Sequence, residues 1–343
     1  MKRYTALARL AGLLCLVIGS VSNPAFSQTS NGDEPAFDRL RQTVKSDYFN
    51  LGVVVQTVGD LVWDRDGLPG NNGFSIATSR LKVNGELDFG LGYFVQTDFA
   101  RSPALLDARL SYKIAEYLSV DAGLFKAPFS AEFLIGAPSI DFVNRSQTVS
   151  TLAPGRQVGV GLRGGTSDGM FGYRVGVFNG NGRTLSGNDN NRLMYTARVT
   201  TRPNVSNGFL EVGANLAFSE DNSAGFNGDR LLFGGDFRWT MERLLVSAEA
   251  IYADLDPVAG MSRQPFGYQA TVGYMLDPDR HQILGRFDSF DLDTIGGSSD
   301  FIVLGYNFWP SQAFEFQVNY LIPVHDGSRV GDQQILVNFQ VAF

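Results

Sequence analysis

Apolar and polar residues alternate through the last segment of the chain, 335–343 (ILVNFQVAF). Large apolar side chains occupy every second position up to the terminal Phe343, while Asn338 and Gln340 lie between them. A repeat of two residues places side chains on opposite faces of an extended strand. The pattern therefore predicts a strand with one apolar face and one polar face.

Two further segments show the same alternation, with arginine on the polar face. In 191–202 (NRLMYTARVTTR), apolar side chains alternate with arginines, and in 229–240 (DRLLFGGDFRWT) they oppose Arg230 and Arg238. A water-facing strand of a soluble protein would carry more Lys, Glu and Thr on its polar face. We interpret the apolar side as facing lipid and the arginine side as facing an aqueous lumen, as in outer-membrane barrels.

Sixteen segments of this kind follow one another along the chain, each long enough for a tilted membrane-spanning strand. Their expected bounds are 47–60, 73–86, 90–100, 104–114, 117–127, 156–165, 169–179, 191–202, 208–218, 229–240, 243–254, 265–276, 280–290, 299–309, 312–322 and 333–343. Together they predict an all-β fold, a 16-stranded antiparallel transmembrane β-barrel over 47–343. The even number of strands places both ends on the periplasmic side.

The connections between these segments alternate in length. Those after even-numbered strands are short, such as Met241-Glu242 and Pro310-Ser311. Those after odd-numbered strands are mostly long, at 61–72, 128–155, 180–190, 219–228, 255–264, 291–298 and 323–332, with an exception around 101–103. Short periplasmic turns and long extracellular loops are typical of outer-membrane barrels. A soluble β-sandwich also has alternating strands, but it would bury the apolar face and would rarely show this one-sided loop pattern.

The first 27 residues, 1–27, are expected to be a signal peptide rather than part of the fold. A basic start precedes an apolar stretch, 10–21, and small residues occupy the positions before the expected cleavage site. Cys15 is the only cysteine and lies inside this segment. An exported chain without disulfides points to the envelope of a Gram-negative bacterium. The polar segment 28–46 is expected to be a short periplasmic lead.

Composition excludes several other classes of protein. Apolar residues make up 44% of the chain and charged residues 18%, which does not fit a disordered chain. Outside the first 25 positions there is no run of about 18 apolar residues, so the chain is not a helical membrane protein. A formal net charge of −7 argues against a nucleic-acid partner. Without paired histidines or an HExxH motif, no metal and no cofactor is expected.

An outer-membrane enzyme and a purely structural barrel are weaker alternatives. A Ser–His lipase needs its pair at hydrogen-bond distance on the lipid-facing edge. His281, with Ser289 nearby, and His325 in a loop give no such signature. A structural or adhesive barrel would have a plugged lumen without measurable conductance.

The longest connection, 128–155, joins the fifth and sixth expected strands. In a sixteen-stranded barrel the lumen passes water and ions, and a long loop after the fifth strand can fold inward and set the narrowest cross-section. Successive segments resemble landmarks of the phosphate-selective porin O and P family, namely 79–100, GLFKAPFS at 123–130, SIDFVNRS at 139–146, LAPGRQVGVGLRG at 152–164 and GVFNGNG at 176–182. The resemblance covers about 74–343. It implies a trimeric, anion-preferring channel with lysines at the loop constriction and a ladder of arginines on the wall.

Cations on the predicted lumen-facing sides are candidate contacts for a passing anion. Arginine suits phosphate because its planar guanidinium donates paired hydrogen bonds and stays charged. By strand parity the wall candidates are Arg80, Lys82, Arg109, Lys113, Arg163, Arg174, Arg192, Arg198, Arg202, Arg230, Arg238 and Arg286. They outnumber the acids on the same faces, so an acidic chain is compatible with a positive pore wall. The alternative role for any one arginine is to brace the wall, as Arg238 could do with Asp236.

Three further cations belong to the expected constriction. Lys126, in GLFKAPFS, matches the family's motif position, and its alternative role is to reach lipid headgroups from a strand end. Arg156 could line the exit or cap the base of the loop. Arg145 is the only strong cation inside the loop, against Glu132 and Asp141. Because a high-affinity phosphate site needs several converging cations, a weakly selective general-diffusion porin for small hydrophilic solutes remains the alternative.

The expected location is the outer membrane, and the expected partners follow from it. They are outer-membrane lipids, small inorganic anions and the barrel-assembly machinery, whose terminal aromatic signal Phe343 resembles. A homotrimer is implied by the family resemblance alone.

Overall fold

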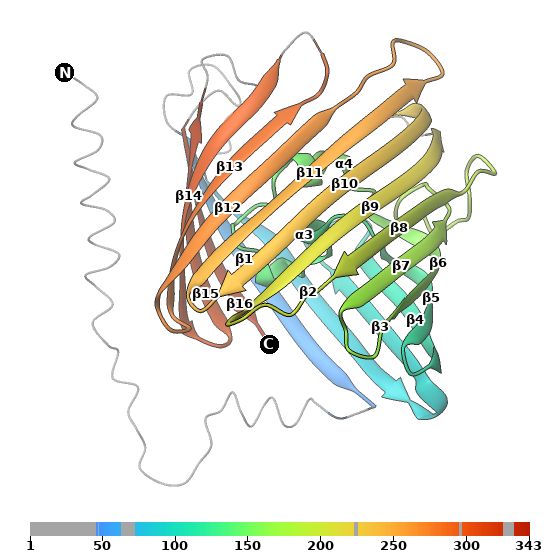
Figure 1. Cartoon of the computed structure of the whole chain (residues 1–343), viewed down its shortest axis with the longest axis horizontal. Coiled ribbons are helices and arrows are strands. Elements are labelled where there is room, and N and C mark those ends of the chain that lie inside the picture. Colours follow the sequence, from blue (N-terminus) through green and yellow to red (C-terminus); the bar gives the residue numbers. More distant parts are fainter. Residues whose placement is uncertain (1–45, 47, 63–72, 223–225, 295–296, 325–332) are drawn as a thin grey trace. The chain divides into compact units, whose positions relative to one another are not determined.

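The computed structural model describes residues 46, 48–62, 73–222, 226–294, 297–324 and 333–343 (Figure 1). The expected signal peptide, 1–27, lies outside these residues, as does the expected periplasmic lead, 28–46, apart from its last residue. No helix in the described part of the chain has the length and apolar character needed to span a membrane.

Sixteen strands close into one antiparallel barrel, in which each strand pairs with its sequence neighbours and β1 pairs with β16. The strands are β1 (Asn50–Val62), β2 (Gly73–Leu87), β3 (Leu91–Asp98), β4 (Leu105–Ala115), β5 (Leu118–Lys126), β6 (Arg156–Gly165), β7 (Phe171–Phe178), β8 (Met194–Thr201), β9 (Gly208–Asn222), β10 (Asn227–Met241), β11 (Leu244–Pro257), β12 (Phe266–Asp277), β13 (His281–Asp291), β14 (Ser298–Ser311), β15 (Phe314–Pro323) and β16 (Gln334–Ala342). At the seam, Phe343 N–H donates to the Val53 carbonyl at 3.1 Å, and the Phe343 carbonyl accepts from Val53 N–H at 3.0 Å. The sixteen-stranded barrel expected from the sequence is confirmed.

Two details differ from the sequence prediction. The long connection expected at 219–228 is largely strand, because β9 continues to Asn222 and β10 begins opposite it at Asn227. Strand β8 begins at Met194, so Arg192 lies in the preceding connection rather than on the wall. The physical reason is the same in both cases. Apolar alternation marks only the part of a strand that faces lipid, whereas the hydrogen-bonded ladder ends independently of that pattern.

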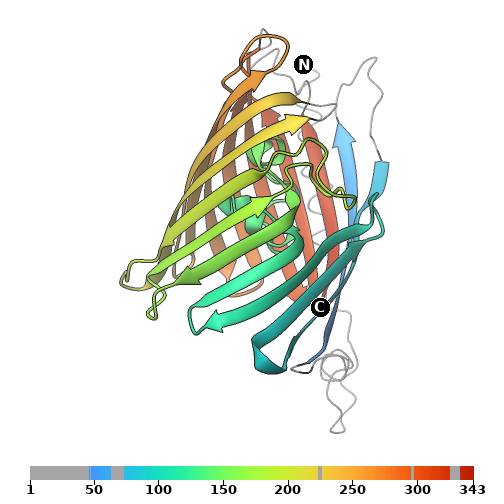
Figure 2. The ribbon, with the colours of Figure 1, turned by 90° about the vertical axis from the view of Figure 1, so that its right-hand side faces the viewer.

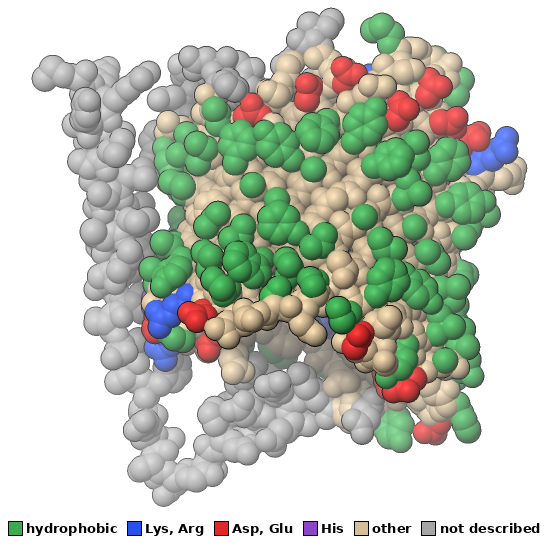
Figure 3. All heavy atoms as spheres, viewed as in Figure 1, with side chains coloured by type: hydrophobic (Ala, Val, Ile, Leu, Met, Phe, Trp, Pro, Cys, Tyr) green, Lys and Arg blue, Asp and Glu red, His purple; other side chains and the backbone are tan. Residues whose placement is uncertain are grey.

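Side-chain burial in the barrel is the reverse of that in a soluble protein. On β16, Phe339 is 55% exposed, whereas Asn338 is 1% exposed. On β12, Val272 is exposed beside buried Thr271. Apolar side chains spread over the outer face, and acidic side chains gather at its two rims (Figure 3). This outer apolar belt is the surface that a barrel needs in lipid.

The connection between β5 and β6 folds into the barrel. It contains α3 (Ala131–Leu134), the 3-10 turn η2 (Ala137–Ser139) and α4 (Gln147–Leu152). Figure 2 shows these short green helices enclosed by the strands. The inward-folding loop expected from the sequence is confirmed, and we refer to 127–155 as the inner loop.

Two apolar clusters fix the inner loop to the wall. In the first, Phe129, Val149 and Leu152 of the loop pack against Ala217, Leu232, Ile251, Ala253 and Phe290 of the wall. In the second, Phe142 packs against Leu245, Leu284, Phe301 and Val303. The body of the inner loop therefore lies on the β9–β14 side of the lumen.

Glycines on the same wall allow the loop to approach closely. A Cβ atom added at Gly267 would lie 2.1 Å from Thr148 Oγ1, and one added at Gly305 would lie 2.9 Å from the Phe142 ring. Such distances are shorter than van der Waals contact. The absence of a side chain at Gly267 and Gly305 is thus a requirement for docking of the inner loop.

Candidate functional site: the ion pathway

Lys126 ends β5, and its ammonium group holds the inner loop. Nζ donates to the carbonyl oxygens of Phe133 at 2.6 Å, Leu134 at 3.2 Å and Ile135 at 2.8 Å. These carbonyls lie at the C-terminal end of α3, where they lack intrahelical partners. An ammonium group has three donors, and this contact uses all of them. The hydrogen-bond donors of Lys126 are therefore committed to the inner loop.

Arg145 binds the same turn of the loop. Its Nε donates to the Glu132 carbonyl at 3.1 Å and its Nη2 to the Ile135 carbonyl at 2.7 Å. Burial lowers the pKa of the Arg145 guanidinium from its usual value, and the Glu132 charge opposes this effect. Arginine stays protonated even so, because its ordinary pKa is far above working pH. Two cations thus converge on one end of α3.

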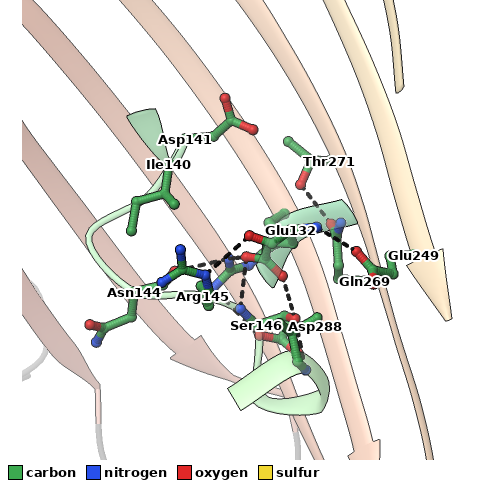
Figure 4. A network of polar contacts seen from close by, with 12 residues as sticks. Glu132, Ile140, Asp141, Asn144, Arg145, Ser146, Glu249, Gln269, Thr271 and Asp288 are labelled. Atoms are coloured by element: carbon green, nitrogen blue, oxygen red, sulfur yellow. Dashed lines mark hydrogen bonds and ion pairs between the residues drawn. The ribbon is translucent and has the colours of Figure 1, made fainter. Parts of the chain in front are cut away.

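Wall carboxylates hold the other side of the inner loop (Figure 4). Glu249 accepts from Glu132 N–H at 2.9 Å, and Asp288 accepts from Gln147 N–H at 3.1 Å. Glu132 in turn accepts from Ser146, from its N–H at 2.9 Å and from its hydroxyl at 2.6 Å. Carboxylates on the β11 and β13 wall are therefore used to bind loop amides.

Six cations gather on the opposite side of the lumen, where the β2–β6 wall meets the inner loop. This mouth cluster consists of Arg80, Arg101, Lys126, Arg145, Arg156 and Arg183, and electrostatic interactions link the other members to Arg156, to Arg101 or to both. Asp98 pairs with Arg80 at 2.9 Å, and Asp107 pairs with Arg156 at 3.1 Å. The cations outnumber these wall carboxylates, so the mouth cluster has a positive surplus.

Two members of the mouth cluster come from connections and escaped the sequence prediction. Arg101 lies between β3 and β4, 3.5 Å from Asp98. Arg183 lies between β7 and β8, and its Nη1 donates to the Pro103 carbonyl at 2.8 Å. Burial, followed by the charges of Arg156 and Arg101, lowers the pKa of Arg183. Strand parity assigns a side to strand residues only, so the sequence held no comparable signal for these two.

Three arginines form a second group near the periplasmic turns. Arg163 on β6, Arg174 on β7 and Arg198 on β8 lie directly opposite one another in the sheet register. We call them the vestibule row. Like charges in directly opposed positions are destabilising. Arg163 is offset by Asp121 at 3.0 Å, and Arg198 by Asp236 at 2.5 Å.

The vestibule row lines a cavity of about 520 Å³ below the inner loop. Arg202 and Arg238 reach the same cavity from the neighbouring wall. The five arginines thus line one space, although they come from β6, β7, β8 and β10 and, in the case of Arg202, from the residue that follows β8. Of the sequence candidates, the structure brings these five together here and Lys126, Arg145, Arg156 and Arg80 together in the mouth cluster.

Arg238 does not pair with Asp236, the partner that the sequence offered for a bracing role. Arg238 instead donates to Asp141 of the inner loop at 2.7 and 3.0 Å. Asp236 binds Arg198, as described above. The wall arginine is therefore bridged to the loop, a contact that alternation along one strand does not reveal.

The remaining candidates are dispersed along the wall and its rims. Arg109 lies 3.8 Å from Asp121, and Arg230 lies 2.6 Å from Asp221. Lys82 lies on β2 opposite Gln96, and Lys113 is exposed on β4 opposite Ser119. Arg192 pairs with Glu220 at 3.2 Å, while Arg286 lies over the Phe142 ring at 4.5 Å.

The described residues hold no group of three or more His, Cys, Asp or Glu side chains placed to bind a metal. His281 Nδ1 lies 2.7 Å from the Tyr306 hydroxyl, and its ring stacks on Phe308. His325 lies outside the described residues.

Comparisons with known proteins agree with this architecture. The model of the family described as phosphate-selective porin O and P matches residues 54–233. No curated protein sequence matches the chain significantly.

Solved structures share the fold at low sequence identity. The anion-selective porin from Comamonas acidovorans has a TM-score of 0.68 at 14% identity, covering 86% of this chain and 99% of that one. The loop L8 deletion mutant of OmpT, an outer membrane protein of Vibrio cholerae, has a TM-score of 0.63 at 13% identity, covering 86% and 99%. The in-vitro folded trimer form of the same protein has a TM-score of 0.58 at 12% identity, again covering 86% and 99%.

The family match covers more than half of the chain. It extends from β1 into β10 and includes the inner loop, the mouth cluster and the vestibule row. The match thus contains the elements that form the candidate pathway. The chain belongs to the phosphate-selective porin O and P family of outer-membrane porins.

Proposed function

We propose that this protein is a passive channel for small anions in the outer membrane of a Gram-negative bacterium, with phosphate and related oxyanions as its solutes. The observation that carries the proposal is the division of charge across the lumen. Most of the described lumen cations line the β2–β8 side, whereas carboxylates such as Glu249 and Asp288 on the opposite side bind the amides of the inner loop. A passing anion therefore meets a surplus of positive charge.

The two cation groups suit stepwise passage. The mouth cluster collects anions above the inner loop, and the vestibule row receives them below it. Guanidinium groups replace part of the hydration shell of an oxyanion with paired hydrogen bonds. Conduction also requires that no single site binds too tightly, and several weaker sites in sequence satisfy that condition.

A weakly selective general-diffusion porin is the second candidate, and a specific observation favours it. Many lumen arginines are paired with carboxylates, among them Arg80 with Asp98 and Arg163 with Asp121. Paired arginines brace the wall and attract a free anion less strongly. A catalytic role and a purely structural role form no part of our proposal.

The assembly and its partners are also proposals. The trimer form of the similar Vibrio cholerae protein supports a homotrimer. The exposed apolar belt supports contact with outer-membrane lipids. Phe343 closes the β1–β16 seam through its backbone, and we propose that the barrel-assembly machinery recognises it.

Phosphate titration of the chloride current in planar bilayers tests the proposed solute. We expect millimolar or lower phosphate to block the current of the wild-type channel, because phosphate competes with chloride at the mouth cluster. Arg156→Gln is expected to raise the half-blocking concentration. Arg243→Gln is the matched control, since Arg243 is exposed at a periplasmic turn and donates to the Leu276 carbonyl. Free permeation of neutral sugars without phosphate block would favour the general-diffusion porin instead.

A further inference from the structure

Arg174 differs from the other arginines of the vestibule. It lies between Arg163 and Arg198 in the register of β6–β8, and both of these have carboxylate partners. Among the residues that the structure describes, Arg174 itself has no ion pair and no side-chain hydrogen bond, and it is exposed to the cavity. A guanidinium group carries five donors and no acceptor. Its donors are therefore available to an anion in the cavity.

The carboxylates that line the same cavity are already engaged. Glu116 accepts from the Tyr117 hydroxyl at 2.9 Å. Glu211 lies 2.7 Å from Arg202, and Asp236 binds Arg198. The arginine contacts offset the charges of Glu211 and Asp236, whereas Glu116 has a hydroxyl partner near the periplasmic turn. Among the arginines of the described cavity lining, Arg174 is the one without a contact to a carboxylate.

The cavity also has apolar surface that an inorganic ion does not need. Leu134 and Ile135 of the inner loop lie at its upper side, and Tyr117 and Phe209 lie near the periplasmic turns. Phe209 is 46% exposed, and the Arg202 guanidinium carbon lies 5.9 Å from its ring centre. Covering such surface with an apolar group is favourable. Binding sites for small organic molecules combine apolar lining with a few placed polar groups.

We propose that this cavity binds an organic anion with an aromatic body, a monocarboxylate of the benzoate type. The carboxylate accepts from Arg174, with Arg163 beside it, and the ring covers Phe209 and the apolar side chains of the inner loop. This inference rests on the proposed anion channel and extends its solutes from inorganic oxyanions to aromatic carboxylates. It assigns the selection step to the periplasmic side of the inner loop.

A comparison of two probes of equal charge tests the site. Benzoate and acetate are titrated against the chloride current of the full-length channel in planar bilayers, from each side in turn. We expect benzoate to half-block at a concentration about tenfold lower than acetate, because only benzoate covers the apolar surface. The difference is expected to be larger from the side that carries the periplasmic turns.

Variants separate the two parts of the site. Arg174→Gln is expected to raise the half-blocking concentration of benzoate by about tenfold, since a charge-assisted hydrogen bond is lost. Phe209→Ser is expected to abolish the preference for benzoate over acetate without changing the block by acetate. Arg243→Gln and Phe89→Ser are the matched controls, because both residues are exposed at periplasmic turns outside the cavity.

The outcomes distinguish this inference from the proposed function. An anion-selective channel that benzoate and acetate block equally overturns the aromatic site alone. Unchanged benzoate block in a folded Arg174→Gln channel also overturns it. A channel without anion preference overturns the proposed function as well.

Discussion

Truncation of Phe129 tests how the inner loop is held in the lumen. Phe129 is 0% exposed and packs in the first apolar cluster with Leu232 and Ile251 of the wall. Its ring also lies against the wall at Gly234, where an added Cβ would be 3.3 Å from Cζ. We expect Phe129→Ala to weaken docking of the loop while leaving the barrel intact, because the strands are held by their own hydrogen-bonded ladders.

The size of the effect follows from the burial. Replacing a fully buried Phe by Ala costs about 3–5 kcal/mol. Since about 1.4 kcal/mol corresponds to a factor of ten, the ratio of undocked to docked loop is expected to rise by about two to three and a half powers of ten. The polar contacts of Glu132 and Gln147 and the second apolar cluster remain in the variant, so the loop is expected to open intermittently.

Single-channel recording and limited proteolysis measure this opening. We expect the variant to show a larger and noisier conductance, with faster cleavage within 127–155. Phe89→Ala is the matched control, because Phe89 is 91% exposed at the turn between β2 and β3. A Phe129→Ala channel with the conductance and protease resistance of the wild type would refute the packing argument.

Three further predictions concern other parts of the chain. Lys126→Met removes the side-chain donor from the Phe133 and Leu134 carbonyls and should increase conductance fluctuations. A purely electrostatic role would lower anion selectivity without added noise. Gly267→Val should accelerate proteolysis of the inner loop, since the Cβ of the new valine would collide with Thr148. Protease resistance equal to that of the wild type would count against close docking of the inner loop on β12. Deletion of Phe343 should reduce the amount of folded, heat-modifiable protein in the outer membrane, because a seam contact and the proposed assembly signal are lost. Unchanged incorporation would contradict the proposed recognition of Phe343 by the barrel-assembly machinery.

The fold was accessible from the sequence because one physical constraint acts on every strand. Each spanning strand must present apolar groups to lipid and polar groups to the lumen, as Phe339 and Asn338 do on β16. Strand ends were less accessible, as at 219–228, where the ladder continues past the apolar pattern. The sequence could therefore predict the number and order of strands, but not the residue at which each strand ends at the rim of the barrel.

The candidate site was only partly accessible, since its contacts join residues far apart in the sequence. Parity placed Arg163, Arg174 and Arg198 in the lumen, but their direct opposition depends on the register between strands. The bridge from Arg238 to Asp141 joins the wall to the inner loop. Likewise, the carbonyl contacts of Lys126 depend on how the loop folds back over β5. Periodicity carries no information on any of these contacts.

The reversal potential of the purified channel under a potassium chloride gradient decides whether the cationic side of the lumen governs permeation. The division of charge across the lumen predicts a potential of anion-selective sign. It also predicts a shift toward zero in Arg174→Gln and Arg156→Gln, with no shift in Arg243→Gln. A potential near zero or of cation-selective sign in the wild type would contradict the account, because the surplus of cations on the β2–β8 side would then not control the passing ion.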